Sequence, residues 1–378
     1  MSTEDIKIQE ESDVDKEDLY GGRSNEVITK PFNPNEIDVD ISTVNLGSLI
    51  DQLENDEIDL QPDFQRATDV WDNVKKSRLI ESILLGLPLP SFYFSEDPVS
   101  QKLSIIDGLQ RICAIRDFVL KEEDPLKLEG LQFLKNFEGL TYSQLARPEV
   151  KRIKSLKITM NTLRKGTPLD VKYIIFQRVN TAGEPLTSQE MRHALNQGPA
   201  AIFIKKLADM ESFKKATNYS VKSKRMQDRD FANRFVAFFI GYQDYTGDLD
   251  MFLNDKMGEL NRMTSEQREG IRVSFDKAMK CCYDIFKEDT FRKRYKLDDR
   301  RKPISKAVYD TLSVNIAWLS DEERKLLLKN AEVFKGGMIR LFNDEKFNFS
   351  ISTGTGQKYN VDLRFTMVKS LIKGIISQ

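Results

Sequence analysis

The spacing of apolar residues changes at one point within residues 103–119. The run Leu-Ser-Ile-Ile is typical of a strand, and it breaks at Asp107-Gly108. After the break, apolar residues recur at helical spacing, at Leu109, Ile112, Ile115 and Val119. The sequence therefore predicts a strand, a tight turn and a helix that begins directly after the turn.

Similar patterns predict further elements before and after this segment. Strands are expected at residues 37–41, 92–94, 102–106 and 156–160, and helices at residues 72–85 and 168–179. Ser42 or Thr43 is expected to cap a short helix that ends at Leu53. Thr187-Ser188-Gln189-Glu190 has the form of a capping box, as do residues 264–267 and 320–323.

From about residue 200 onward the pattern is predominantly helical. The predicted fold class is therefore α+β, with a mainly α-helical C-terminal half. We expect a disordered acidic tail at residues 1–35, an α+β domain at residues 36–198 and a helical domain at residues 199–378. The tail is predicted because residues 1–20 contain eight acidic and two basic residues.

The turn at Asp107-Gly108 can be interpreted in two ways. A strand that runs directly into a helix aims unpaired N–H groups and the helix dipole at one point, where an anion such as phosphate is stabilised. Arg111, one turn into the helix, could bind the same anion with two N–H groups. Alternatively, Asp107-Gly108 makes only a tight connection, with Asp107 capping the helix.

The composition excludes several classes of site. The 378 residues are 40% hydrophobic and carry a formal net charge of −1. No apolar stretch is long enough to span a bilayer, and the three cysteines lack metal or disulfide spacing, so we expect a reducing, cytoplasmic location. The single histidine, His193, makes a histidine-rich zinc site or a ββα-metal nuclease hard to build. It is more often a packed helix residue than a catalyst.

Basic residues gather in three stretches. Residues 147–165 contain seven basic residues and one acidic residue. Two further clusters lie at residues 222–234 and 291–302. Such charges usually form a solvated face, and contact with nucleic acid is the alternative. The candidate DNA contacts are Arg152, Lys224, Arg225, Arg292 and Arg294.

Four motifs occur in the order found in one known family. They are Pro62-Asp63-Phe64-Gln65-Arg66 with Trp71; residues 79–90, which end in Leu-Pro-Leu-Pro; Asp107-Gly108-Leu109-Gln110-Arg111; and Phe176, Arg178, Asn180, Gly183 and Leu186 followed by Glu190 and Arg192. With these motifs, residues 40–245 resemble the DGQQR-motif family, the N-terminal domain of GmrSD-type modification-dependent restriction enzymes. The resemblance implies a ParB/sulfiredoxin-like core.

The chain departs from the family pattern in two respects. Leu109 replaces the commoner glutamine, so a polar contact to nucleotide is lost there, or else Leu109 packs on the apolar face of the helix. Family members that cut DNA carry a second, HNH-type domain rich in histidine, whereas no histidine follows residue 245 here. An HNH site needs histidine to activate water, so we expect no nuclease activity from this chain alone.

The resemblance implies a Mg²⁺-dependent nucleoside triphosphate site. In that hypothesis residues 107–110 hold the phosphates through their backbone, Arg111 and Arg66 clamp them, and Asp107 or Glu190 binds Mg²⁺ or orients water. No dedicated protein metal site is expected. The full predicted site has catalytic residues Asp107, Glu190 and Arg111 and nucleotide-binding residues Gln65, Arg66, Asp107, Gly108, Gln110, Arg111, Arg178, Asn180 and Arg192. The structural alternative is a buried ion-pair network of Arg66 and Arg111 with Asp107 and Glu190.

Three functions stay open from the sequence. The first is a nucleotide-binding, NTP-hydrolysing sensor or regulator of restriction and anti-phage defence. The second is a DNA-binding module without catalysis. The third is an adaptor whose helical half recruits a separately encoded nuclease or another defence subunit. The expected partners are thus a nucleotide, DNA or such a subunit, or a second copy of the chain, and no membrane.

Overall fold

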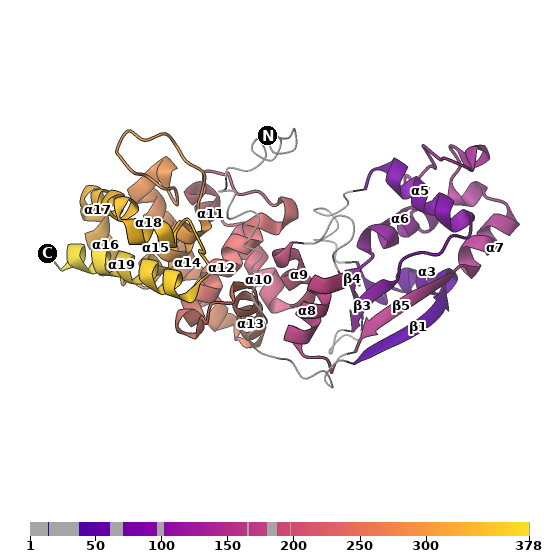
Figure 1. Cartoon of the computed structure of the whole chain (residues 1–378), viewed down its shortest axis with the longest axis horizontal. Helices are drawn as coiled ribbons and strands as arrows, with labels where there is room; N and C mark the ends of the chain where they lie inside the picture. The colour runs from indigo at the N-terminus through magenta and orange to yellow at the C-terminus, as the bar shows by residue number, and fades with distance from the viewer. Residues whose placement is uncertain are drawn as a thin grey trace. The chain divides into compact units, whose positions relative to one another are not determined.

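The computed structural model describes residues 14, 38–60, 71–96, 102–164, 166–179, 187–196 and 198–377. The chain forms two compact units, which we call the sheet unit, Lys30–Leu195, and the helical unit, which includes Asn196–Gln378 (Figure 1). The predicted α+β fold with a mainly helical C-terminal half is confirmed. Among the described residues, no helix is long and apolar enough to cross a membrane.

The sheet unit is built on a five-stranded mixed sheet in the order β1-β5-β3-β4-β2. The strands are β1 (Val39–Asn45), β2 (Ile58–Asp59), β3 (Phe92–Glu96), β4 (Leu103–Asp107) and β5 (Lys157–Leu163). Strand β5 pairs antiparallel with β1, and β3 pairs antiparallel with β4. The pairs β3–β5 and β2–β4 are parallel. The strand that carries the Asp107 turn therefore lies between β3 and the short edge strand β2.

Neighbouring residues of β4 face different groups of helices. Ile105 joins a core with residues of α3 (Leu46–Glu54), α5 (Asn73–Leu84), α6 (Leu109–Val119) and α7 (Arg147–Ser155). Ile106 is also buried but lies outside this core, because successive strand residues point to opposite faces. Helices α8 (Leu169–Val179) and α9 (Ser188–Leu195) pack against β4. The 3₁₀ turns Lys135–Phe137 and Tyr142–Gln144 complete the described part of this unit.

The predicted cap at Ser42 or Thr43 is wrong. Strand β1 continues to Asn45, with its full length paired to β5 from Val39↔Leu163 to Asn45↔Lys157. Helix α3 begins only at Leu46, and Asn45 precedes it without a side-chain capping bond. The sheet ladder satisfies the backbone through this segment, so pairing with a distant strand replaces the local capping preference.

A buried glutamate in α5 holds the loop at residues 129–134. The Glu81 carboxylate accepts hydrogen bonds from the backbone N–H groups of Gln132, Phe133 and Leu134 at 3.0, 2.6 and 2.8 Å. Burial alone would raise the pKa of Glu81, but these three donors and the nearby Lys135 together hold that pKa below its ordinary value. The carboxylate must therefore stay ionised for the loop to keep this structure.

Replacing Glu81 with glutamine should release the loop. The amide retains only one good acceptor for three N–H groups, so hydrogen-exchange protection of residues 132–134 should fall. In the unchanged protein, the contribution of the charged carboxylate is present at neutral pH. This stabilisation should begin to decrease when the pH falls below 4.5, the ordinary pKa of a glutamate. It should be lost completely once the pH is below the lowered pKa of Glu81 in the folded protein. Glu122→Gln, at an exposed position, is the control. If residues 132–134 exchange at the same rate in the Glu81→Gln and Glu122→Gln variants, Glu81 does not hold the loop.

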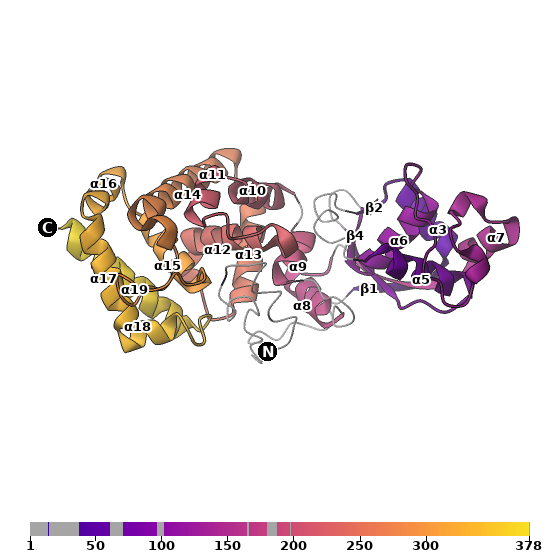
Figure 2. The same ribbon diagram turned by 90° about the horizontal axis from the view of Figure 1, so that it is seen from above.

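The helical unit packs its helices around an aromatic core. Phe231 and Tyr309 lie with ring centroids 4.8 Å apart, as do Phe235 and Phe275. Helices α16 to α19 gather at one end of this unit (Figures 1 and 2). Its helices are α10 (Pro199–Ala208), α11 (Glu211–Ala216), α12 (Gln227–Gly241), α13 (Leu249–Arg262), α14 (Ser265–Phe286), α15 (Lys306–Ala317), α16 (Asp321–Lys329), α17 (Ala331–Asn343), α18 (Glu345–Ser350) and α19 (Lys358–Ile376). Its 3₁₀ turns are η4 (Lys224–Met226), η5 (Tyr242–Asp244) and η6 (Lys287–Asp289).

Local signals set several of these helix boundaries. Thr264 and Gln267 form the predicted capping box of α14, and Ser320 and Glu323 form that of α16. Val14 belongs to the same unit, where it is buried and forms a parallel bridge with Ile304. The other residues of the predicted acidic tail, 1–13 and 15–35, lie outside the described residues.

Candidate functional site at the start of helix α6

The predicted strand, turn and helix are present at residues 103–119. Strand β4 ends at Asp107 and α6 begins at Leu109. Gly108 lies between them with φ of 103°, in the left-handed region that favours glycine. A Cβ atom at Gly108 would lie 2.6 Å from Cδ1 of Phe92. Both its backbone conformation and the close approach of this ring therefore require glycine in the turn.

The structure uses Arg111 to fix the turn. Its guanidinium forms a salt bridge with the Asp107 carboxylate at 2.7 Å. It also donates to the backbone carbonyls of Pro90 and Ser91 and lies 4.5 Å from the centre of the Phe92 ring. Only 11% of the side chain is exposed. Arg111 thus binds the loop before β3 to the start of α6 and is a positioning residue for Asp107.

Asp107 is the more accessible member of this pair. Its side chain is 27% exposed, and one oxygen is held by Arg111. Burial raises the pKa of the Asp107 carboxyl above its ordinary value, although Arg111 and the N–H of Gly108 both favour the ionised form. The structure therefore presents a half-buried, oriented carboxylate next to the first turn of α6.

Gln110 connects the turn to the segment of the first motif. Its Oε1 accepts a hydrogen bond from the backbone N–H of Trp71 at 3.3 Å. Trp71 directly follows residues 61–70, which contain Gln65 and Arg66 and lie outside the described residues. This bond gives the Gln110 oxygen a structural partner, and the predicted contact of Gln110 with a nucleotide stays a prediction.

Helix α9 brings two further motif residues to β4. Glu190 is fully buried, and its carboxylate accepts from the N–H of Thr187 at 2.7 Å, so the predicted capping box is confirmed. Arg192 is also buried, and its Nε donates to Gln189 at 3.1 Å. These contacts give Glu190 a capping role, and its catalytic role stays a prediction.

The remaining predicted nucleotide-binding residues are placed only in part. Arg178 is exposed in the last turn of α8. Asn180 and Gly183 lie outside the described residues. The sequence reasoning missed Lys172 of α8, which is buried and donates to Ser95 Oγ on β3 at 2.9 Å. A single lysine on a helix gives no sequence signal for such a contact, because the partner is distant along the chain.

Three of the predicted DNA contacts bind protein groups. Arg152 donates to the carbonyl of Leu84 at the end of α5. Arg292 is buried and donates to the carbonyls of Glu288 and Lys302, and Arg294 pairs with Asp289. Lys224 is exposed and Arg225 is half-buried in η4. The role of these residues in DNA binding stays a prediction.

Metal ligands do not cluster in the part of the chain that the structure describes. No group of three histidine, cysteine, aspartate or glutamate residues there could hold a metal ion. Mg²⁺ in nucleotide sites is commonly bound by one or two carboxylates together with the substrate's phosphates. Asp107 can supply one such carboxylate, so the residues present fit a metal that arrives with a nucleotide.

Comparison with known proteins gives a family match for most of the sheet unit. No curated protein and no solved structure matches the chain. Residues 46–196 match the family described as the GmrSD restriction endonuclease, N-terminal domain. The matched segment begins with α3 and ends just after α9, so it includes the signature turn and both flanking groups of helices. The ParB/sulfiredoxin-like description of the core stays a prediction. Residues 46–196 are thus similar to the N-terminal domain of GmrSD restriction endonucleases.

Proposed function

We propose that the chain is a nucleotide-dependent sensor or regulator in restriction-type defence, with its nucleotide site at the Asp107 turn. The role in restriction is inferred from the family that residues 46–196 match. The observation that supports the nucleotide site is the Asp107 carboxylate, oriented by Arg111 beside the first turn of α6. The Asp107 carboxylate and Arg111 both belong to the sheet unit and lie within the matched residues.

The charges at the turn favour a metal-bound nucleotide over a free phosphate. N–H groups in the first turn of a helix attract anions. The Asp107 carboxylate beside them would repel a bare phosphate, since two negative groups would then share a half-buried site. A Mg²⁺ ion held by the Asp107 carboxylate would neutralise the charges of this group and of the phosphates. The proposed ligand is therefore a nucleoside triphosphate with Mg²⁺.

Arg111 has a different role in this proposal from the one the sequence suggested. Its N–H groups are directed at Asp107, Pro90 and Ser91, so it orients the carboxylate and does not clamp phosphate. Phosphate contacts come instead from the backbone N–H groups of Leu109 and Gln110, since the N–H of Gly108 is bonded to the Asp107 carboxylate. Bound Mg²⁺ would supply charge neutralisation of the phosphates.

Titration with ATP, GTP and CTP, each with Mg²⁺ and with EDTA, tests the proposal. We expect saturable binding of at least one nucleotide that weakens in EDTA. Asp107→Asn keeps the shape of the side chain but removes its charge, and should weaken binding in Mg²⁺ by about tenfold or more. Asp124→Asn is the matched control, because Asp124 has a side chain that is 97% exposed and a φ of 52° that asparagine tolerates.

Two results would contradict this function. One is the absence of binding by all three nucleotides with Mg²⁺. The other is equal affinity of the Asp107→Asn and Asp124→Asn variants, provided that circular dichroism shows both to be folded. Release of inorganic phosphate from the bound nucleotide, measured in the same samples, would establish whether binding leads to hydrolysis.

A further inference from the structure

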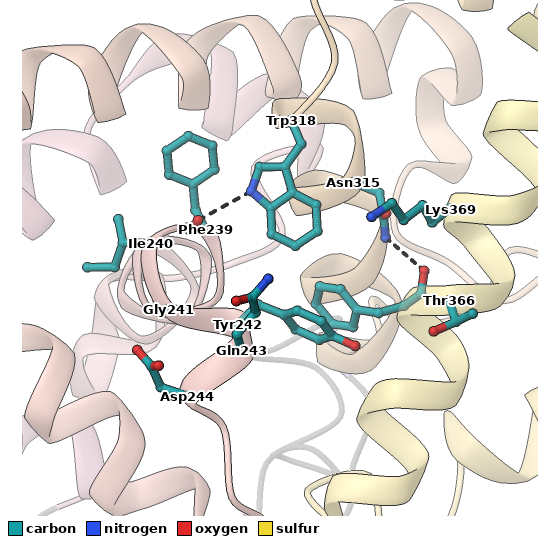
Figure 3. Close-up of a pocket in the computed structure, with 11 residues that line it drawn as sticks. Phe239, Ile240, Gly241, Tyr242, Gln243, Asp244, Asn315, Trp318, Thr366 and Lys369 are labelled. Carbon is teal, nitrogen blue, oxygen red and sulfur yellow. Dashed lines mark hydrogen bonds between the residues drawn. The ribbon is translucent and has the colours of Figure 1, made fainter.

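A hollow of about 420 Å³ lies in the helical unit, far along the sequence from the Asp107 turn. Its lining comes from the C-terminal end of α12 with η5, the end of α15 and the middle of α19. Figure 3 shows the side chain of Trp318 above that of Tyr242, with Lys369 and Asp244 on opposite sides. The volume falls within the range of small-molecule sites.

Three aromatic rings form a fixed surface in this hollow. Tyr242 stacks on Phe365 with ring centroids 4.5 Å apart, and Trp318 lies 5.8 Å from Tyr242. The indole N–H of Trp318 donates to the carbonyl of Phe239 at 3.3 Å, and the Tyr242 hydroxyl donates to Asp362 at 3.1 Å. Trp318 is nevertheless 39% exposed. Both side chains are therefore held in place while part of the indole stays open to a ligand.

The charges around the rings favour a ligand that carries a negative charge. Asp244 is paired with Lys256 at 2.6 Å, and Lys256 also pairs with Glu259 at 2.9 Å, so this side of the hollow keeps one negative charge. Asp244 lies on the side opposite Lys369 (Figure 3). Lys369 is exposed, and within the described part of the chain it forms no salt bridge. An aromatic cage for a cation would place the ligand's charge next to this ammonium. The lining instead suits a planar ring that carries a negative group.

A second hollow of about 240 Å³ shares Asn315, Trp318 and Lys369 with the first. It adds Lys373 and Glu323, and Glu323 is held by its capping box with Ser320. Lys369 thus lies where the two hollows meet, next to the indole. A ligand whose aromatic ring is in the first hollow can place an anionic group at Lys369 and extend toward Lys373.

We propose that this pair of hollows binds a nucleotide unit, with its base stacked against Trp318 and its phosphate at Lys369. The unit is either a free mononucleotide or one residue of a single strand, since both present the same ring and phosphate. Stacking on an aromatic side chain tolerates any base, because every base has a π-face. This site is separate from the one at the Asp107 turn and does not depend on it.

The fluorescence of Trp318 provides a direct test. The chain contains two tryptophans, so Trp71→Phe in the full-length protein leaves Trp318 as the only indole. We expect AMP or a short single-stranded oligodeoxyadenylate to quench this fluorescence saturably, because the base stacks on the indole. Lys369→Ala in the same background should weaken the apparent affinity by about tenfold. The control Lys346→Ala removes the same charge from an exposed position on α18 outside both hollows.

The quenching of Trp318 fluorescence distinguishes the two sources of the ligand and tests the site itself. Quenching by the strand at lower concentration than by AMP identifies a residue of a nucleic acid as the ligand, and the reverse order identifies a free nucleotide. No quenching by either would overturn the site. Equal affinity in the Lys369→Ala and Lys346→Ala variants would overturn the assignment of the phosphate to Lys369.

Discussion

Replacing Gly108 with alanine should lower the free energy of unfolding of the sheet unit by about 2–4 kcal/mol. Part of this cost arises because φ at Gly108 is 103°, which a residue with a Cβ rarely adopts. The rest arises because the new Cβ would lie 2.6 Å from Phe92, a fully buried ring of the core. The proposed nucleotide binding at the turn should fall as well, since Phe92 also supports Arg111.

The measurement is urea unfolding followed by Trp71 fluorescence in a Trp318→Phe background. Trp71 belongs to the sheet unit, and its backbone is bonded to Gln110 beside the substituted residue. Gly139→Ala is the matched control, because Gly139 has a φ of 81° but nothing within 4 Å of an added Cβ. We expect that control to lose only the conformational part, about 1–2 kcal/mol. If the two variants lose the same free energy, the contact with Phe92 does not contribute.

Removing the carboxylate of Asp310 should destabilise the helical unit by about 3–5 kcal/mol. Asp310 is completely buried on α15, where it accepts a 2.9 Å hydrogen bond from Arg234 on α12. Arg364 on α19 is also buried, and its guanidinium lies 3.9 Å from the same carboxylate. In Asp310→Ala, both guanidinium groups lose their shared counter-charge without access to water. The large expected effect is the cost of keeping two positive charges buried after their carboxylate counter-charge has been removed.

Urea unfolding followed by Trp318 fluorescence in the Trp71→Phe background measures this loss, since Trp318 directly follows α15. Asp310→Asn should lose less than Asp310→Ala, because it keeps a hydrogen-bond acceptor. As control, Glu332→Ala breaks a salt bridge with Lys335 whose glutamate side chain is 80% exposed, and should cost about 0–1 kcal/mol. A loss of only that size in Asp310→Ala would show that the arginines can reach solvent.

Several elements of the site were predictable because their signals are local. The β-branched run before Asp107 and the 3.6-residue spacing after Gly108 predicted β4 and α6, and both are present. The capping boxes at Thr187, Thr264 and Ser320 also form as predicted, because each needs only residues three positions apart. The four ordered motifs indicated the family that residues 46–196 match.

Other features depend on residues that are distant in sequence. Arg111 was predicted to bind phosphate, yet it contacts the carbonyls of Pro90 and Ser91 and the ring of Phe92. Nothing in the spacing of Arg111 reveals partners about 20 positions earlier, because they depend on the pairing of β3 with β4. The same reason explains the error at Ser42, where pairing with β5 extends the strand beyond the local capping residues.

The sequence by itself thus determined the strand, the glycine turn and the helix that carry the candidate site, since these follow from local sterics and from periodicity. Only the tertiary structure decided which side chains at that turn are available to a ligand. Arg111, Gln110 and Glu190 are bonded to protein groups, whereas Asp107 retains exposed surface. The aromatic hollow at Trp318 likewise could not be predicted from the sequence, because residues of α12, α15 and α19 meet there only through long-range packing.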